Sequence, residues 1–218
     1  MIPNPAAGSN ASELWKSELD RHRSDTTILA VPENHQLGKT DTWFTYASML
    51  TRRRPDLGID FVGKMDGDNS MRFHTFARFL IENKDDIDAH PYVHGGYVVP
   101  RYQCERPSWG RVCAGSEFIA PLFVTGAISY LSTPLAQSVY LDGTTLEQKR
   151  DVWIGLEDLQ VSNMAYSNPK INPEEILVLN HRGRPKPSIT EHCSNSPSCL
   201  RRKYCEAYPG LFPELCDG

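Results

Sequence analysis

Two aspartates with a single glycine between them stand directly after an apolar segment of the chain. Asp66 and Asp68 flank Gly67, and residues 59–65 supply the apolar segment. Ligands of α/β proteins bind at the carboxyl ends of strands. Carboxylate oxygens suit Mg²⁺ or Mn²⁺, and these ions in turn bind phosphate oxygens. The spacing therefore favours a divalent-cation site for a phosphate-bearing ligand. The alternative is a turn that caps the helix that follows.

A second pair of carboxylates, Glu157 and Asp158, stands at the start of a predicted helix. A carboxylate held beside a substrate hydroxyl can remove its proton as a general base. The helix dipole alone also favours carboxylates at this end of a helix, so a structural role is the alternative. His181 follows a late predicted strand. Imidazole is an acceptable ligand for Mn²⁺, so His181 is a candidate metal ligand. A structural or solvated histidine is the alternative.

The segments around these residues resemble motifs of the β-1,3-galactosyltransferase family, which also includes β-1,3-N-acetylglucosaminyltransferases and Fringe-type enzymes. The matches occur in the family's order over roughly residues 13–182. The segments are 25–33 with Lys39 and Thr40 (the family's D-I-L…E…K-T), 61–68 (K-x-D-D-D), 121–132 (P-x-Y-x-x-G-x-x-Y-x-x-S) and 156–159 (E-D-V). The sequence departs from the family at Gly67, which replaces an acidic residue, and at Ser162, which replaces a glycine.

The resemblance implies a GT-A fold and an inverting transfer of galactose or an N-acetylhexosamine. The donor would be a UDP-sugar, the acceptor a hydroxyl of a glycan or glycoprotein, and the cofactor Mn²⁺ or Mg²⁺. By position, Asp66 and Asp68 would bind the metal and the donor, and His181 would be a third metal ligand. The lysines Lys64 and Lys39 would neutralise phosphate or hold the acidic loop.

The resemblance also places the chemistry of transfer at the second acidic pair. Asp158 would be the general base that takes the proton from the acceptor hydroxyl, and Glu157 would orient the acceptor or the base. An inversion in one step needs one base and no enzyme nucleophile, while the metal stabilises the leaving diphosphate.

The elements that must position these residues alternate along the chain, which predicts the α/β class. Apolar spacing and helix-start signals predict helices at 13–19, 38–50, 74–82, 133–140 and from 156. β-rich runs predict strands at 26–31, 59–65, 92–102 and 175–179, and a strand–turn–strand unit over 118–131 with its turn at Gly126. We therefore expect a GT-A-like mixed sheet flanked by helices, with a cysteine-rich C-terminal tail.

The sequence suggests three regions. Residues 1–12 are predicted to be a flexible N-terminus. Residues 13–183 form the glycosyltransferase-like domain, which would lack the first strand of the family's fold as in an N-terminally truncated member. Residues 184–218 form a cysteine-rich extension without regular structure, which contains four of the six cysteines.

The cysteines favour disulfides and an oxidising compartment. Cys104 and Cys113 flank a short turn-rich loop and are the expected pair, while the pairing in the tail stays open. Free thiols and a zinc site are the alternatives, and the tail has no C-x-x-C spacing that would favour zinc. The sequon at Asn10 is compatible with a glycoprotein.

Composition excludes several classes of protein. The 218 residues carry 23 Lys and Arg against 27 Asp and Glu, a net charge of −4, so nucleic acid is not an expected partner. No apolar run reaches the roughly 18 residues of a membrane span. The family resemblance implies action in the Golgi lumen, and any targeting or membrane segment would then lie outside this sequence. A catalytically inactive carbohydrate-binding or scaffolding relative, and a secreted protein whose acidic turn binds Ca²⁺ structurally, are the alternatives.

Overall fold

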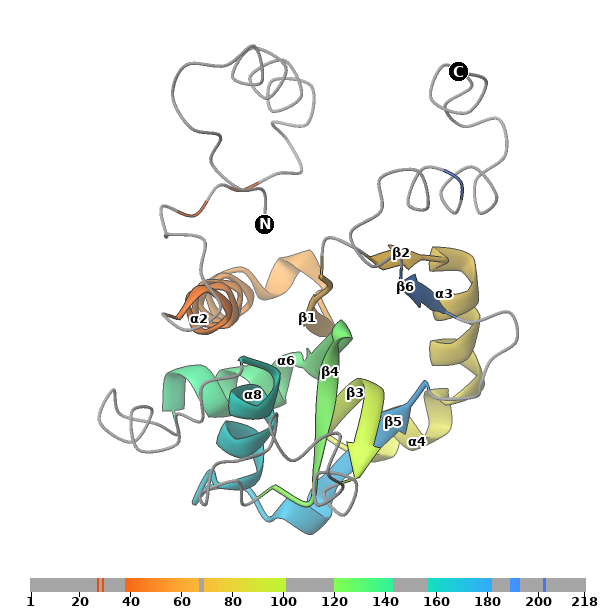
Figure 1. Ribbon diagram of the computed structural model, residues 1–218. Helices are drawn as coiled ribbons and strands as arrows, with labels where there is room; N and C mark the ends of the chain where they lie inside the picture. The colour runs from red at the N-terminus through yellow and green to blue at the C-terminus, as the bar shows by residue number, and fades with distance from the viewer. Residues whose placement is uncertain are drawn as a thin grey trace, which may run out of the picture.

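The protein is a mixed α/β structure built around a four-stranded sheet with helices on both sides (Figure 1). The structure is a computed structural model that describes residues 27, 29, 38–66, 69–100, 120–142, 157–181, 189–192 and 202. Its helices are α2 (Lys39–Arg53), α3 (Phe73–Glu82), α4 (Lys84–Ala89), α6 (Thr133–Gln137) and α8 (Glu157–Tyr166). Short helical turns are η1 (Pro55–Leu57), the π-helical η2 (Ser138–Asp142) and η3 (Pro173–Glu175).

The main sheet has the strand order β1-β4-β3-β5. The strands are β1 (Phe61–Lys64), β4 (Leu122–Ser132), β3 (Tyr92–Pro100) and β5 (Ile176–Asn180). Strand β4 pairs antiparallel with β1 and β3, whereas β3 and β5 are parallel. A separate antiparallel pair joins β2 (Asn69–Met71) to β6 (Thr190–His192).

Each face of the main sheet buries its own apolar cluster, because side chains alternate between the two faces along a strand. One cluster joins the sheet to α2, α6, η2 and α8 and contains the fully buried Phe44, Leu131 and Leu135. The other joins the sheet to α3 and contains Phe79 and Tyr130. Figure 1 shows α2, α6 and α8 on one side of the strands and α3 and α4 on the other.

Local sequence explains where the helices begin and end. Gly38 precedes α2 with a φ of 86°, a left-handed conformation that glycine adopts without a steric penalty. The same helix ends at Arg53, just before Pro55, with Arg52 and Arg53 near its negative end. Pro134 stands in the first turn of α6, where its missing N–H costs no hydrogen bond.

Most of the expected elements in the described residues are present, with bounds shifted by a few residues. The strand–turn–strand prediction is wrong at Gly126, which lies inside the single strand β4. Sequence reasoning missed α4 and both strands of the β2–β6 pair, in which β6 comes from residues expected to lack regular structure. Within the expected strand at 26–31, the described Thr27 and Leu29 are not in a strand.

Several predictions fall on residues that the structure does not describe. They concern the N-terminus 1–12, the helix at 13–19, Asp68, and all six cysteines with the Cys104–Cys113 pairing. Among the helices that are described, none combines the length and the apolar character needed to cross a membrane.

Candidate functional site

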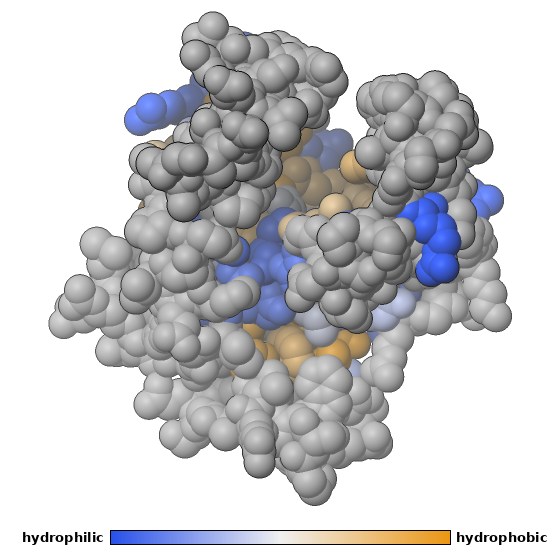
Figure 2. Space-filling model, turned by 45° about the horizontal axis from the view of Figure 1, so that its top comes forward, coloured by the Kyte–Doolittle hydropathy of each residue, from blue (hydrophilic) through white to orange (hydrophobic). Residues whose placement is uncertain are grey.

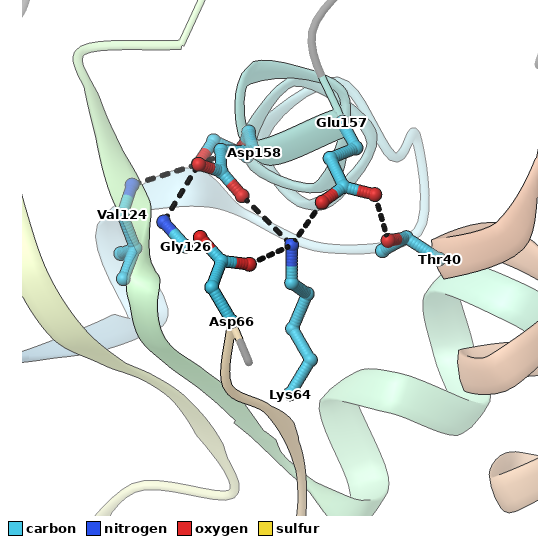
Figure 3. Close-up of polar contacts among 8 residues, drawn as sticks. Thr40, Lys64, Asp66, Val124, Gly126, Glu157 and Asp158 are labelled. Carbon is cyan, nitrogen blue, oxygen red and sulfur yellow. Dashed lines mark hydrogen bonds and ion pairs between the residues drawn. The ribbon is translucent and has the colours of Figure 1, made fainter. Parts of the chain in front are cut away.

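The polar side chains of the candidate site meet at the end of β1 and come from β1, the loop after it, α2 and α8 (Figure 3). Lys64 is the last residue of β1, and Asp66 follows two residues later. Glu157 and Asp158 are the first two residues of α8, and Thr40 is the second residue of α2. The structure thus brings together four of the site residues predicted from sequence: Lys64, Asp66, Glu157 and Asp158.

Lys64 lies at the centre of this group and contacts all three carboxylates. Its Nζ atom is 3.3 Å from Asp66 Oδ1 and 3.2 Å from Asp158 Oδ1, and it donates a further hydrogen bond to Glu157. The lysine side chain is only 11% exposed. Burial disfavours its ammonium, but the charges of Asp158 and Glu157 outweigh burial and raise the pKa of Lys64. Lys64 is therefore a fixed positive charge at neutral pH.

Asp158 is held from two directions. Its Oδ2 accepts a 2.6 Å hydrogen bond from the backbone N–H of Gly126, and its Oδ1 faces Lys64. Burial and the neighbouring Asp66 and Glu157 raise the pKa of Asp158, against the opposing effect of Lys64. A raised pKa makes this carboxylate a stronger base than an ordinary aspartate.

Glu157 differs from its neighbour in its proton affinity. Its carboxylate accepts hydrogen bonds from Thr40 Oγ1 and Lys64 Nζ. Burial opposes ionisation, but the charge of Lys64 and these two hydrogen bonds outweigh it and lower the pKa of Glu157. Lys39, the first residue of α2, adds a weaker effect in the same direction. Glu157 is therefore an anion at neutral pH, and its hydrogen bond with Thr40 links α8 to the start of α2.

Asp66 is the most exposed of the three carboxylates, with a side chain that is 43% exposed. Its backbone N–H donates to the carbonyl oxygen of Gly126 at 2.9 Å. Its side chain lies over Gly126, where a Cβ atom would approach Asp66 Oδ2 to 2.1 Å. Asp66 can therefore reach a ligand in solvent while its backbone stays fixed to β4.

His181 lies in a different environment from these carboxylates. It directly follows β5, is 2% exposed, and its Nε2 lies 2.9 Å from the hydroxyl of Tyr130. Its ring packs against the rings of Phe76 and Phe79. Burial lowers the pKa of His181 to about 4, so the imidazole is neutral at pH 7. Among the described residues, the contacts of His181 are with aromatic side chains and the backbone of Gly96, and none is with the carboxylates at the end of β1.

The donor set at the end of β1 suits a hard divalent cation. Three carboxylates around one ammonium leave a formal charge of −2 when every group is ionised. Within the described ranges no three His, Cys, Asp or Glu residues form a metal-holding group, and Asp68 lies outside those ranges. Mg²⁺-type sites commonly use one or two carboxylates and complete their shell with water and substrate phosphates. The chemistry of Asp66 fits such a site.

Figure 2 views the molecule from a direction in which the top of Figure 1 comes forward. Hydrophilic residues gather near the middle of this face, with hydrophobic residues beside them. A polar surface next to an apolar one suits ligands that have both charged and uncharged parts.

Sequence reasoning missed two contributors to the site. Thr40 was noted only as part of a motif, yet it is the hydroxyl partner of Glu157, 117 residues away. Gly126 was taken for a turn residue, yet its backbone contacts both Asp66 and Asp158. Neither role leaves a local pattern, because each depends on how distant segments meet in the fold.

Comparison with known proteins adds no identification. No family model matches the chain, and no curated protein matches its sequence significantly. The functional argument therefore rests on the residues and their geometry.

Proposed function

We propose that the protein is an inverting, metal-dependent glycosyltransferase of the β-1,3-galactosyltransferase type, with a GT-A-like fold. It moves galactose or an N-acetylhexosamine from a UDP-sugar to a hydroxyl of a glycan or glycoprotein acceptor. The observation that carries the proposal is the grouping of Lys64, Asp66, Glu157 and Asp158 at the carboxyl end of β1. These residues come from two separate motifs of the resemblance, at 61–68 and 156–159.

The proposed reaction needs one base, and Asp158 has the properties of one. Its raised pKa favours proton capture from an acceptor hydroxyl as that oxygen attacks the anomeric carbon. The new glycosidic bond forms as the bond to the diphosphate breaks, which inverts the anomeric centre. Asp158 keeps the proton until it passes to solvent, and UDP leaves with the electron pair of the broken bond.

The other residues of the site orient Asp158 and balance charge. Glu157 has a lowered pKa and remains an anion, so it orients Lys64 rather than competing for the proton. Lys64 balances part of the carboxylate charge. Asp66, together with Asp68, would hold Mn²⁺ or Mg²⁺, and that ion would neutralise charge on the leaving diphosphate when bound. His181 packs among aromatic rings, and its role as a third metal ligand stays a prediction.

The cellular setting belongs to the same proposal. Enzymes of the proposed type act on glycans in the secretory pathway, so we propose the Golgi lumen as the site of action. The six cysteines, four of them in residues 184–218, favour disulfides in that oxidising compartment. We expect neither nucleic acid nor a membrane-spanning segment of this sequence to take part in transfer.

Hydrolysis of the donor tests the proposal without knowledge of the acceptor, since water can replace the acceptor hydroxyl. Release of UDP from UDP-galactose and UDP-N-acetylglucosamine should require Mn²⁺ or Mg²⁺. In Asp158→Asn the rate should fall by about 100-fold or more, the usual contribution of a general base. Affinity for UDP should remain.

The matched control is Asp86→Asn, which changes an exposed carboxylate on α4 and should keep the wild-type rate. Equal rates in Asp158→Asn and wild type would overturn the assigned base. Metal-dependent UDP binding without turnover of either donor would instead favour the catalytically inactive relative.

A further inference from the structure

The hydrogen-bond register between β3 and β4 breaks beside the candidate site. Gly96 lies opposite Ser129, but the next residue, Tyr97, lies opposite Thr125. Residues 126–128 of β4 therefore have no partner residues on β3. They have none on β1 either, because that pairing ends where Lys64 faces Ser129. We call residues 126–128 the β4 bulge.

The β4 bulge frees the backbone of Gly126 from both neighbouring strands, and both of its polar groups turn to the site. The N–H of Gly126 donates to Asp158 Oδ2 at 2.6 Å, and its carbonyl accepts the N–H of Asp66 at 2.9 Å. Bulges commonly occur beside active sites, where they redirect a strand's groups away from the ladder. Gly126 thus contacts both Asp66 and Asp158 through its backbone.

The absent side chain of Gly126 has a separate effect. A Cβ atom there would lie 2.1 Å from Asp66 Oδ2 and 2.7 Å from Asp66 Cγ, both far inside contact distance. Because those atoms end a flexible side chain, a methyl group at this position would push the carboxylate aside rather than disrupt the strand. Glycine at position 126 therefore reserves the space that the Asp66 carboxylate occupies.

Gly96 explains why the bulge occurs at this point. Its φ of 142° is a conformation that residues with side chains rarely adopt. A Cβ atom on Gly96 would also meet the carbonyl oxygen of Ile128 at 2.1 Å, and a backbone atom cannot move aside easily. The bulge thus needs glycine on the facing strand, which makes it a feature built into the fold.

We infer that the β4 bulge sets the spacing of the Asp66 and Asp158 carboxylates, with Gly126 as the positioning residue. Gly126 fixes Asp158 through its N–H, and it fixes Asp66 through its carbonyl and through the space left by its missing side chain. The assignment of these carboxylates to metal, donor and base rests on the proposed function. The positioning itself is a property of the metal-free protein.

The test compares Gly126→Ala with wild type in the full chain without metal. The ¹³Cγ resonances of Asp66 and Asp158, assigned with Asp66→Asn and Asp158→Asn, report the surroundings of each carboxylate. The Asp66 resonance should move in Gly126→Ala, because the new methyl group displaces that carboxylate. The resonance of Asp142, which pairs with Arg52 elsewhere, should stay. The matched control is Thr125→Ala, beside Gly126 but paired with Tyr97, and it should leave both site resonances unchanged.

A second measurement does not depend on the folding of Gly126→Ala. In Asp158→Ala the N–H of Gly126 loses its acceptor, so its hydrogen exchange should accelerate by tenfold or more relative to that of Val98, which donates elsewhere. An unmoved resonance of Asp66 in a folded Gly126→Ala would overturn the inference. Unchanged exchange at Gly126 in Asp158→Ala would do the same.

Metal titration separates this inference from the proposed function. If wild type binds Mn²⁺ with UDP, Gly126→Ala should bind it 10–100-fold more weakly, as is common when a group that orients a metal ligand is changed. Equal affinity would overturn the positioning role. A wild type that binds neither Mn²⁺ nor UDP would overturn the proposed function alone, because the two measurements without metal still decide the role of Gly126.

Discussion

At the scale of single residues, Lys64 is the shared cationic partner of three neighbouring carboxylates. Its ammonium contacts Asp66, Glu157 and Asp158 at once. In a partly buried setting such contacts are stronger than at the surface, and the loss of one partner leaves uncompensated charge. Lys64 thus contributes to stability as well as to the proposed chemistry.

Lys64→Met should therefore destabilise the protein. We expect a loss of about 2 kcal/mol in the free energy of unfolding, less than the 3–5 kcal/mol of a fully buried pair. The loss is smaller because the Asp66 and Asp158 side chains keep contact with solvent, at 43% and 26% exposure. Urea denaturation measures this difference.

The control for this prediction is Lys84→Met, which breaks an exposed pair with Asp88 on α4. Exposed pairs contribute little, so its free energy of unfolding should stay close to that of wild type. If Lys64→Met costs no more than Lys84→Met, the central role of Lys64 is wrong.

Some residues of the site could be predicted from sequence, and others could not. Asp66 and Asp158 were predicted because a carboxylate just after a strand or at the start of a helix itself suggests metal binding or general-base chemistry. His181 carries the same type of signal, yet its position is decided by the aromatic side chains around it, which sequence spacing does not reveal. Gly126 and Thr40 were missed as contributors because a backbone N–H and a hydroxyl leave no distinctive pattern.

At the scale of elements, glycines allow the central strands to pack closely around one tyrosine. Gly95 on β3 and Gly63 on β1 both lie opposite Tyr130 of β4. The Tyr130 ring lies over Gly95, where a Cβ atom would approach its Cζ to 2.1 Å. This placement brings the Tyr130 hydroxyl to His181.

Gly95→Ala should therefore be strongly destabilising, because the new methyl group overlaps a buried ring. Overpacking of this kind typically costs about 1–3 kcal/mol. In a Tyr130→Ala background the same change should cost much less, since the overlapping atoms are gone. A double-mutant cycle measured by urea unfolding tests this coupling, and equal costs in the two backgrounds would show that Gly95 does not make room for Tyr130.

Elements with a strong repeating pattern were predictable, and elements defined by distant pairing were not. The apolar repeat of α3 and the basic end of α2 indicated those helices directly. The strands β2 and β6 have three residues each and exist because they pair with each other. Similarly, the β4 bulge is visible only in the register against β3.

At the scale of the whole molecule, each face of the sheet buries a histidine beside its apolar cluster. His94 on β3 is fully buried near Tyr166, on the side of α8. His181 lies on the opposite side, against α3. Burial lowers the pKa of each imidazole to about 4, from an ordinary value of 6.5. Both histidines are therefore neutral in the folded protein at neutral pH.

This burial makes stability depend on pH in a defined direction. Between pH 6.5 and 4 the unfolded chain binds protons that the folded chain does not, so these histidines lower stability as the pH falls. Each should contribute a loss of about 3 kcal/mol across that window, and the loss should level off below pH 4.

His94→Phe isolates one of the two contributions. As the pH falls from 6.5 to 4, the free energy of unfolding should decrease less in this variant than in wild type, so the difference between the two should grow. Above pH 7 the difference should be constant, because His94 is neutral there in both states. Urea titrations at a series of pH values measure it, and a difference that is constant over the whole range would exclude a neutral buried His94.

The central claim is that the end of β1 binds a nucleoside diphosphate through a divalent cation. Calorimetric titration of UDP in Mn²⁺ and in EDTA, on wild type, Asp66→Asn and Asp60→Asn, tests it most directly. Asp60 is an exposed carboxylate just before β1 and serves as the matched control. We predict that wild type binds UDP in Mn²⁺ but not in EDTA. Asp66→Asn should lose this binding, and Asp60→Asn should keep it. An absence of binding to wild type in Mn²⁺, or equal binding in Asp66→Asn, would contradict the account.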